Sequence, residues 1–205
     1  MSAAAAFSAN PAPWAEVVPG MRPVTVDLLL ELPDDGNIHE VVEGVLVRVA
    51  GSGFNATTIA IELAAELRDY TRPRRLGRVT GADGVYKFPG AETGLLPDVG
   101  FTGVDKVSLI ADRSKLLPFA PDLAVEVASP SQGPDAMAAK ARAYLAGGTR
   151  LVWVIWPTSG NIDVWRPDHL AGPARTLNLS ETLDGEDVIP GFTYSVASLF
   201  ADPLG

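Results

Sequence analysis

A strand–helix–strand segment in the second half of the chain constrains the fold more than any other feature. Residues 122–128 read DLAVEVA and residues 151–156 read LVWVIW, two almost continuously apolar runs of strand length. Residues 135–146, between them, predict a helix that stops at Gly147-Gly148. Strands joined by a crossover of this kind lie parallel, with a right-handed connection. The segment therefore predicts a sheet with residues 151–156 near its centre and with helices packed against it.

The rest of the chain predicts antiparallel hairpins and one long helix around this unit. Residues 39–42 and 45–50 flank Glu43-Gly44 as a hairpin, and apolar residues at helical spacing predict a helix over residues 55–70. Further elements are expected as strands at 79–88, 95–101 and 161–165 and as short helices at 26–32 and 104–112. The expected fold is a mixed α/β (α+β) domain with a mixed central β-sheet, β-hairpins and flanking helices.

Composition narrows the class of protein. Among the 205 residues there is no cysteine and there are two histidines, which excludes disulfides, thiolate chemistry and a multi-histidine zinc site. A formal net charge of −9 argues against a protein that coats DNA or membranes through a cationic surface. The small residues and prolines of residues 1–22 predict a flexible N-terminal tail, followed by a single domain over residues 23–205. With no signal peptide or membrane span recognised, we expect a cytoplasmic protein.

Three acidic residues are difficult to explain by packing. Glu126 interrupts the apolar run at 122–128, where alternation places Asp122, Ala124 and Glu126 on one face. Burying such an acid without a partner costs several kcal/mol, so the alternative is an edge strand with Glu126 in solvent. Asp98 follows a proline at the start of a strand, and Glu40 lies between apolar neighbours. Together they offer the oxygen ligands that Mg²⁺ or Mn²⁺ prefers.

Lys140 is the fourth unusual residue. It lies three residues after Met137 and four before Tyr144, on the helix face that those residues would bury. An inward lysine needs an acid as a partner. The alternative is a surface lysine whose aliphatic stem alone is buried.

These residues, in this order, resemble those of the Uma-two-type restriction endonuclease family, a branch of the PD-(D/E)xK nuclease superfamily. The resemblance covers residues 24–200, and it is carried by HEVVEGVLVRV, GLLPDVGF, PDLAVEVASPS, KARAYLAGGTRLVWVIWP and IPGFTYSVASLF. The most specific part is PDLAVEVASPS followed by K-x-x-x-Y-x-x-x-G.

The resemblance implies a restriction-endonuclease-like core and the activity of a metal-dependent DNA endonuclease that hydrolyses phosphodiester bonds. Asp98, Glu126, the backbone carbonyl of Val127 and Glu40 would hold Mg²⁺ or Mn²⁺. The lysine of the plain motif would fall at Ala128, so the resemblance points instead to Lys140 on the next helix, which would orient or deprotonate the attacking water. The metal would polarise the scissile phosphate. The resemblance also implies a homodimer.

Two positions depart from the pattern seen in similar proteins. Asn55 stands where they often carry a histidine, and Trp156-Pro157 stands where they often carry Asp-Pro. The first puts an auxiliary phosphate contact in doubt, and the second affects the end of the central strand. Neither touches Glu40, Asp98, Glu126 or Lys140.

Basic residues gather in one stretch of the sequence. Candidate DNA contacts there are Arg72, Arg74, Arg75 and Arg78, with Arg68 close by. The alternative is a solvated helix end whose cations complement the helix dipole. Lys87 is a reserve candidate for the catalytic lysine.

Two other functions use the same residues. One is a nuclease fold that has lost catalysis and serves as a binding or assembly module, which the charge of −9 favours. The other is a metal-dependent hydrolase of a smaller phosphate ester. DNA bound to this chain should be held weakly, with help from the metal and from a local basic strip.

Overall fold

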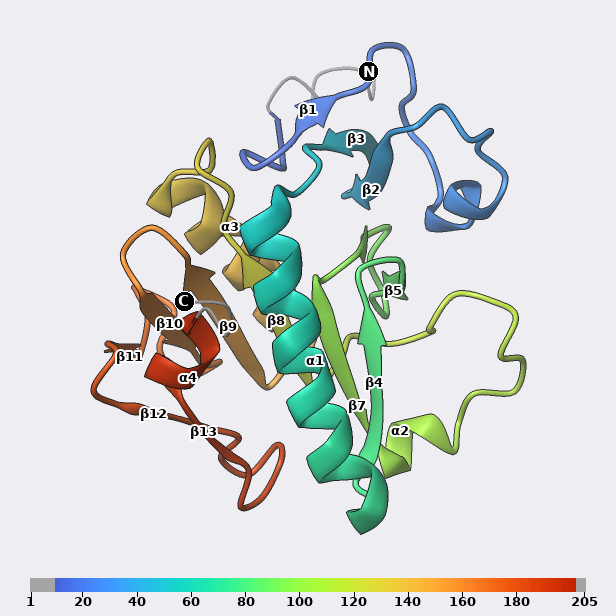
Figure 1. Cartoon of the computed structure of the whole chain (residues 1–205). Helices are drawn as coiled ribbons and strands as arrows, with labels where there is room; N and C mark the ends of the chain where they lie inside the picture. Colours follow the sequence, from blue (N-terminus) through green and yellow to red (C-terminus); the bar gives the residue numbers. More distant parts are fainter. Residues whose placement is uncertain (1–9, 202–205) are drawn as a thin grey trace.

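The computed structural model describes residues 10–201, which form two main sheets, a small third sheet and the helices packed on them (Figure 1). The larger sheet has six strands in the order β11-β10-β9-β8-β7-β4. Its strands are β4 (Gly77–Gly81), β7 (Val99–Gly103), β8 (Leu123–Val127), β9 (Leu151–Trp156), β10 (Asn161–Trp165) and β11 (Arg175–Leu177). β8 and β9 are parallel and central, which confirms the crossover expected from the sequence.

The second sheet has five short strands in the order β1-β3-β2-β6-β5. These strands are β1 (Glu16–Val17), β2 (Ile38–Val42), β3 (Val45–Val49), β5 (Tyr86–Lys87) and β6 (Gly94–Leu95). The expected hairpin is β2–β3, in which Glu43 and Gly44 both adopt a positive φ. A third, two-stranded sheet joins β12 (Thr182–Asp184) to β13 (Thr193–Ser195).

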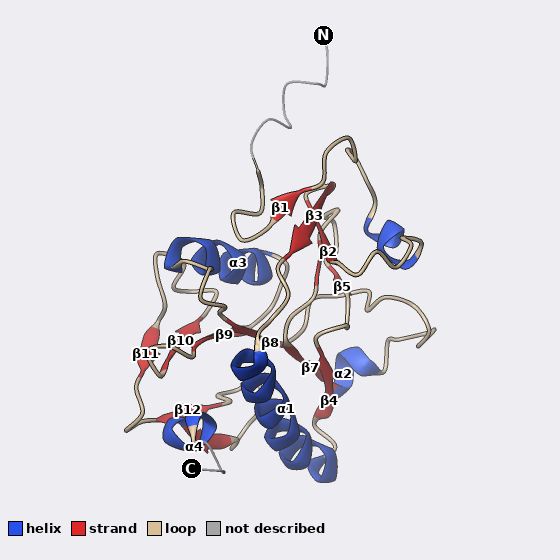
Figure 2. Ribbon diagram, turned by 45° about the horizontal axis from the view of Figure 1, so that its top comes forward, coloured by secondary structure: helices blue, strands red, loops and turns tan. Residues whose placement is uncertain are grey.

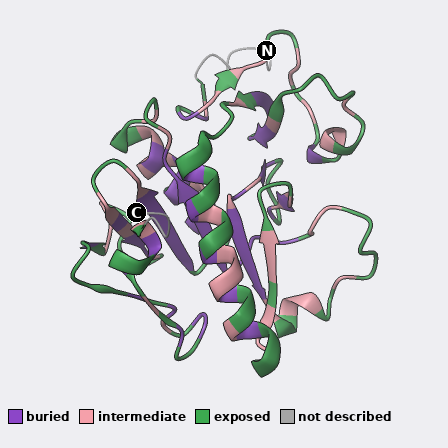
Figure 3. Ribbon diagram, in the orientation of Figure 1, coloured by how far each residue is buried: buried purple, intermediate pink, exposed green. Residues whose placement is uncertain are grey.

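The two longest helices cover opposite faces of the six-stranded sheet (Figure 2). Alternation along β8 and β9 divides the core between them. Leu123, Val125 and Val127 pack with α1 (Phe54–Arg74), whereas Ala124 packs with α3 (Pro134–Ala146). Figure 3 shows the buried residues concentrated along these central strands. The short helices are η2 (Val26–Leu30), α2 (Val104–Val107) and α4 (Val196–Phe200). No helix within residues 10–201 is long and apolar enough to cross a membrane.

Three details differ from the sequence expectations. α1 continues beyond residue 70 to Arg74 and ends where Arg75 adopts a left-handed conformation. The strand expected over residues 79–88 is divided by a turn, because the glycine-rich GADG segment separates β4 from β5, and these two strands enter different sheets. The expected N-terminal tail includes β1, which pairs with β3, whereas residues 1–9 lie outside the described part of the chain.

Candidate active site

Glu126 lies on the central strand β8 with its side chain buried. β8 has β7 on one side and β9 on the other, and Glu126 is in register with Val154 of β9. The residue is 4% exposed, so the alternative of a solvent-facing acid on an edge strand is wrong. Its side chain points to the face that α3 covers, as the alternation of the strand requires.

Lys140 approaches Glu126 from α3. The lysine is 2% exposed, and its Nζ lies 3.0 Å from Glu126 Oε2 and 3.1 Å from Glu40 Oε1. The lysine therefore has two carboxylate partners, and the alternative of a surface lysine is wrong. A buried ammonium ion is tolerated only when charges and hydrogen bonds of this kind compensate for its lost hydration.

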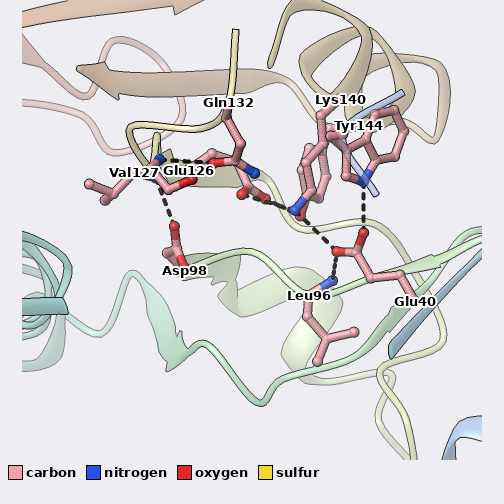
Figure 4. A network of polar contacts seen from close by, with 10 residues as sticks. Glu40, Leu96, Asp98, Glu126, Val127, Gln132, Lys140 and Tyr144 are labelled. Atoms are coloured by element: carbon pink, nitrogen blue, oxygen red, sulfur yellow. Dashed lines mark hydrogen bonds and ion pairs between the residues drawn. The ribbon is translucent and has the colours of Figure 1, made fainter. Parts of the chain in front are cut away.

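Glu40 reaches the same lysine from β2 of the other sheet. Its Oε1 also accepts a hydrogen bond from the backbone N–H of Leu96 at 3.0 Å. Its Oε2 accepts one from the indole Nε1–H of Trp14 at 2.9 Å. Both oxygens of this fully buried carboxylate are therefore occupied by donors from the chain itself (Figure 4).

Asp98 lies where the chain passes from one sheet to the other, between β6 and β7. Its Oδ2 accepts a 2.7 Å hydrogen bond from the backbone N–H of Val127, at the end of β8. This contact fixes Asp98 beside the strand that carries Glu126 (Figure 4). Asp98 is half-buried, in contrast to the buried Glu40, Glu126 and Lys140, and it is thus the member of the group nearest to solvent.

Tyr144 and Trp14 each donate a hydrogen bond to one of the two glutamates, although neither was predicted as a site residue from the sequence. The hydroxyl of Tyr144 donates to Glu126 Oε1 at 2.7 Å, so Glu126 also has a partner at each oxygen. The spacing K-x-x-x-Y was a usable signal for Tyr144, because residues four apart share a helix face. Trp14 had no such signal, because its partner Glu40 lies 26 residues away.

Burial and mutual repulsion decide the charge of this group. Burial, followed by the nearby carboxylates of Asp98 and Glu40, raises the pKa of Glu126 to about 8, although the Lys140 ammonium opposes this rise. Burial likewise raises the pKa of Asp98. Burial alone would lower the pKa of Lys140, but the carboxylates of Glu126, Glu40 and Asp98 together raise it. The lysine is therefore positively charged at neutral pH, whereas Glu126 retains its proton more readily than an ordinary glutamate.

The oxygen donors of this group can be compared with the ligands that a metal ion needs. Within the described residues, no group of three or more acidic or histidine side chains is arranged to hold one. Mg²⁺, however, is commonly bound in proteins through only one or two carboxylates, with water and phosphate oxygens as the other ligands. Asp98 and Glu126 meet that requirement, because Asp98 directly precedes β7, the neighbour of the strand β8 that carries Glu126, and the charges of the two acids interact. Their chemistry therefore fits a hard divalent cation.

The predicted basic contacts lie elsewhere. Arg72 and Arg74 are in the last turn of α1, and Arg75 caps its C-terminus. Arg78 pairs with Thr102, toward the end of β7 that is remote from Asp98. The structure thus brings the four acidic and basic core positions together and leaves these arginines at the opposite end of α1 (Figure 1).

Lys87, Asn55 and Trp156 also lie outside the group formed by Glu40, Asp98, Glu126 and Lys140, which we call the acid cluster. Lys87 is ion-paired with Asp27 at 2.7 Å and lines a cavity of about 660 Å³ that none of the four core residues lines. Asn55 is exposed in the first turn of α1. Trp156 ends β9, where its indole N–H donates to Asp163 of β10 at 2.8 Å, so this departure is accommodated within the sheet.

Comparison with known proteins agrees with this architecture. The fold is similar to that of a crystal structure described as a "putative nuclease belonging to DUF820" from Anabaena variabilis, with a TM-score of 0.71. The two chains are 20% identical, and the similarity covers 87% of this chain and 98% of that one. A search of the curated proteins finds no match. The model of the Uma2 family, described as "Putative restriction endonuclease", matches residues 26–197. The chain therefore belongs to the Uma2 family, which confirms the resemblance carried by its sequence motifs.

Proposed function

We propose that this protein is a metal-dependent DNA endonuclease that hydrolyses phosphodiester bonds, with Asp98, Glu126 and Lys140 as its catalytic residues. One observation carries the proposal: a buried, charged lysine is held by two glutamates beside a half-buried aspartate, all at the meeting point of two sheets. Nothing in the packing of an ordinary core requires this costly arrangement. Membership of a family described as restriction endonucleases supports a nuclease.

Asp98, Glu126 and the backbone carbonyl of Val127 would hold Mg²⁺ or Mn²⁺. When bound, the ion supplies Lewis acidity to the scissile phosphate and lowers the pKa of the attacking water. Glu40 receives a different role from the metal ligand that the resemblance implied. Glu40 is held by Trp14 and Leu96 as well as by Lys140, so we assign it to holding the lysine. Glu126 also has a partner at each oxygen, but it directly precedes Val127, whose N–H bonds Asp98, and it would exchange one of its contacts for the ion.

Lys140 acts in this proposal as a hydrogen-bond donor and a positive charge. A lysine whose pKa is raised keeps its proton at neutral pH, so it is unsuited to removing a proton from water. Its ammonium can orient the water or stabilise negative charge that develops on the phosphate. Because Asp98 is the member nearest to solvent, we infer that the phosphodiester enters from its side.

Cleavage of supercoiled plasmid with Mg²⁺ or Mn²⁺ tests the proposal. We expect Asp98→Asn and Glu126→Gln to lose activity by 100-fold or more, on the order of magnitude of removing a main electrostatic contribution. Asp122→Asn is the matched control. Asp122 is also a buried acid, directly before β8, but it pairs with Lys106 rather than Lys140 and should not affect cleavage beyond its effect on folding. Equal activity in the wild type and both active-site variants would contradict the proposal.

A binding or assembly module without catalysis is the second candidate. The net charge of −9 favours it, because an acidic chain attracts DNA poorly without help. Titration calorimetry with Mn²⁺ separates the candidates: an active site should bind Mn²⁺ in a manner that Glu126→Gln abolishes, and a lapsed site should not. Turnover of a small phosphodiester such as bis(p-nitrophenyl) phosphate without any DNA binding would favour the hydrolase of smaller esters.

We also propose that the protein is a homodimer. Phe54 and Ile61, which are 82% and 68% exposed, lie seven residues apart on α1 and therefore on one side of that helix. A second copy of the chain would cover these apolar side chains. Light scattering should give twice the mass of the chain, and Ile61→Glu should give the monomer. A monomeric wild type would contradict this.

A further inference from the structure

The segment before the family match, Asn10–Val17, is built into the domain. Asn10 Oδ1 accepts the backbone N–H of Ala12 at 2.9 Å, and Asn10 Nδ2 donates to the carbonyl of Ala15 at 3.1 Å. Ala12 is fully buried. β1 then pairs with β3, the strand whose hairpin partner β2 carries Glu40. These contacts fix the segment at both ends of Trp14.

Trp14 is inserted into the same apolar cluster as the face of α3 that carries Lys140. It is 6% exposed and packs in the cluster that includes Ala128, Met137 and Tyr144. Its Nε1–H donates to Glu40 Oε2 at 2.9 Å, so the indole contacts the acid cluster directly. Two other buried tryptophans, Trp153 and Trp165, have no hydrogen-bond partner for Nε1 among the described residues. The Trp14 contact is therefore not a general consequence of burying an indole in this core.

Glu40 links Trp14 to Lys140 through its two carboxylate oxygens. With Oε2 held by Trp14 and Oε1 by the backbone N–H of Leu96, the Glu40 carboxylate has a fixed orientation. That orientation places Oε1 3.1 Å from Lys140 Nζ. Removal of the indole donor would leave a buried carboxylate oxygen without a partner, and Glu40 would turn to recover one.

We propose that Trp14 is a positioning residue of the active site, which acts through Glu40 on Lys140. The active unit of this protein then includes a segment that lies outside residues 26–197, the part matched by its family. The inference deepens the proposed endonuclease function and rests on it for its catalytic consequence, although the linkage from Trp14 to Lys140 is a property of the chain itself.

The kinetic test compares Trp14→Phe with Trp165→Phe in the full-length protein. Both substitutions replace a buried indole of one apolar cluster by a phenyl ring, but only the first removes a hydrogen bond that the indole N–H makes. We expect Trp14→Phe to lower kcat by about 10-fold to 100-fold, because a small displacement of a catalytic group slows the chemical step. KM for DNA should change less than about threefold. Trp165→Phe should change neither beyond threefold. Equal kinetics of the two variants would overturn the proposal.

An NMR measurement does not depend on activity. The chain has four tryptophans and hence four indole N–H resonances, and the one lost in Trp14→Phe belongs to Trp14. In Glu40→Gln and in Lys140→Met, only this resonance should move strongly, whereas those of Trp153 and Trp165 stay in place. An unmoved Trp14 resonance would overturn the linkage. If the resonance moves but the wild type cleaves no DNA, the linkage stands and the proposed function fails. If Trp14→Phe does not fold, the resonance can be assigned in the wild type by connecting the indole ring to the sequentially assigned backbone of Trp14.

Discussion

Lys140 carries more of the chemistry than any other single residue. Its ammonium lies among three carboxylates, two of which it contacts directly. An ion pair buried to this degree stabilises the fold little more than apolar side chains of similar volume would. Removing one partner is nevertheless costly, because it leaves a buried charge without its counter-ion. The lysine is thus needed by the folded protein even before any substrate binds.

Lys140→Met should therefore destabilise the protein strongly. We expect the free energy of unfolding at pH 7 to fall by about 3 kcal/mol, because the buried Glu40 loses its counter-ion and Glu126 loses a hydrogen-bond donor. Lys87→Met is the matched control, since its pair with Asp27 is partly exposed and should contribute no more than about 1 kcal/mol. Urea unfolding followed by circular dichroism measures both values. A loss for Lys140→Met as small as that for Lys87→Met would show that the buried pair contributes no more than the exposed one.

The raised pKa of Glu126 predicts how stability changes with pH. In the unfolded chain this carboxyl titrates near its usual value of 4.5, and in the folded protein near 8, so between these values the folded state binds more protons. Its contribution is fully present below about pH 4.5 and is lost as the pH rises through 8. We expect the metal-free protein to lose about 3 kcal/mol of unfolding free energy between pH 5.5 and 8.5. Glu126→Gln, measured in the same buffers, should lose less.

At the scale of the element, β8 shows how much a local pattern can predict. Its seven-residue run predicted a strand and the division of its side chains between two faces, and both are confirmed. The run left two alternatives for Glu126, and the structure shows the buried acid with a partner rather than the solvent-facing one. Alternation is a property of the backbone, so seven residues are enough to reveal it. The helix α3 and the inward face of Lys140 followed from periodicity in the same way.

The N-terminal segment shows where this reasoning stops. Its small residues and prolines are typical of flexible tails, and no apolar period marks residues 10–17. Its order depends on β3 and Glu40, which lie far along the sequence. The division of residues 79–88 between two sheets was likewise decided by pairing partners, β7 and β6, rather than by local propensity.

The position of α3 on the sheet predicts the effect of a glycine substitution. Gly147 caps the C-terminus of α3, and a Cβ added there would lie 2.3 Å from the ring of Phe88. Gly147→Ala must displace either the helix end or the ring, so we expect a loss of about 2 kcal/mol. A Cβ added at Gly133, the N-cap glycine of the same helix, would have no other atom within 4 Å, and Gly133→Ala should cost less than about 1 kcal/mol.

Thermal and urea unfolding of both variants test this expectation. Because α3 carries Lys140 and Tyr144, Gly147→Ala should also lower the cleavage rate, and Gly133→Ala should not. Two equally stable variants would show that α3 tolerates movement against Phe88.

At the scale of the whole molecule, the active site lies where the two main sheets meet. Glu40 comes from the five-stranded sheet, Glu126 from the six-stranded sheet, and Asp98 from the connection between them. The arginine group Arg72, Arg74, Arg75 and Arg78 lies at the other end of β7 from Asp98: Arg78 pairs with Thr102, four residues or about 13 Å along the strand, and the end of α1 lies just beyond it. That distance corresponds to about four base pairs of duplex at 3.4 Å per pair.

The arginine group should therefore affect the affinity for long DNA but not the chemical step. Replacing all four by glutamine should weaken binding and reduce the dependence of log Kd on log salt by up to about 3.6, roughly 0.9 for each lost phosphate contact. Fluorescence anisotropy with a 30-base-pair duplex measures this, and kcat at saturating DNA should be unchanged. An unaltered salt dependence would place the bound DNA elsewhere on the protein.

The acid cluster and its hydrogen-bond donors are drawn from Trp14 to Tyr144, and this has a consequence for a chain that is still being synthesised. Glu40 and Asp98 leave the ribosome well before Lys140 and Tyr144, and β9, the neighbour of β8, follows later still. A nascent chain that stops before α3 carries all three acids, Glu40, Asp98 and Glu126, but neither the ammonium nor the hydroxyl that holds Glu126. If the protein cleaves DNA, interrupted translation would release inert fragments, and nuclease activity would arise only in chains that are nearly complete.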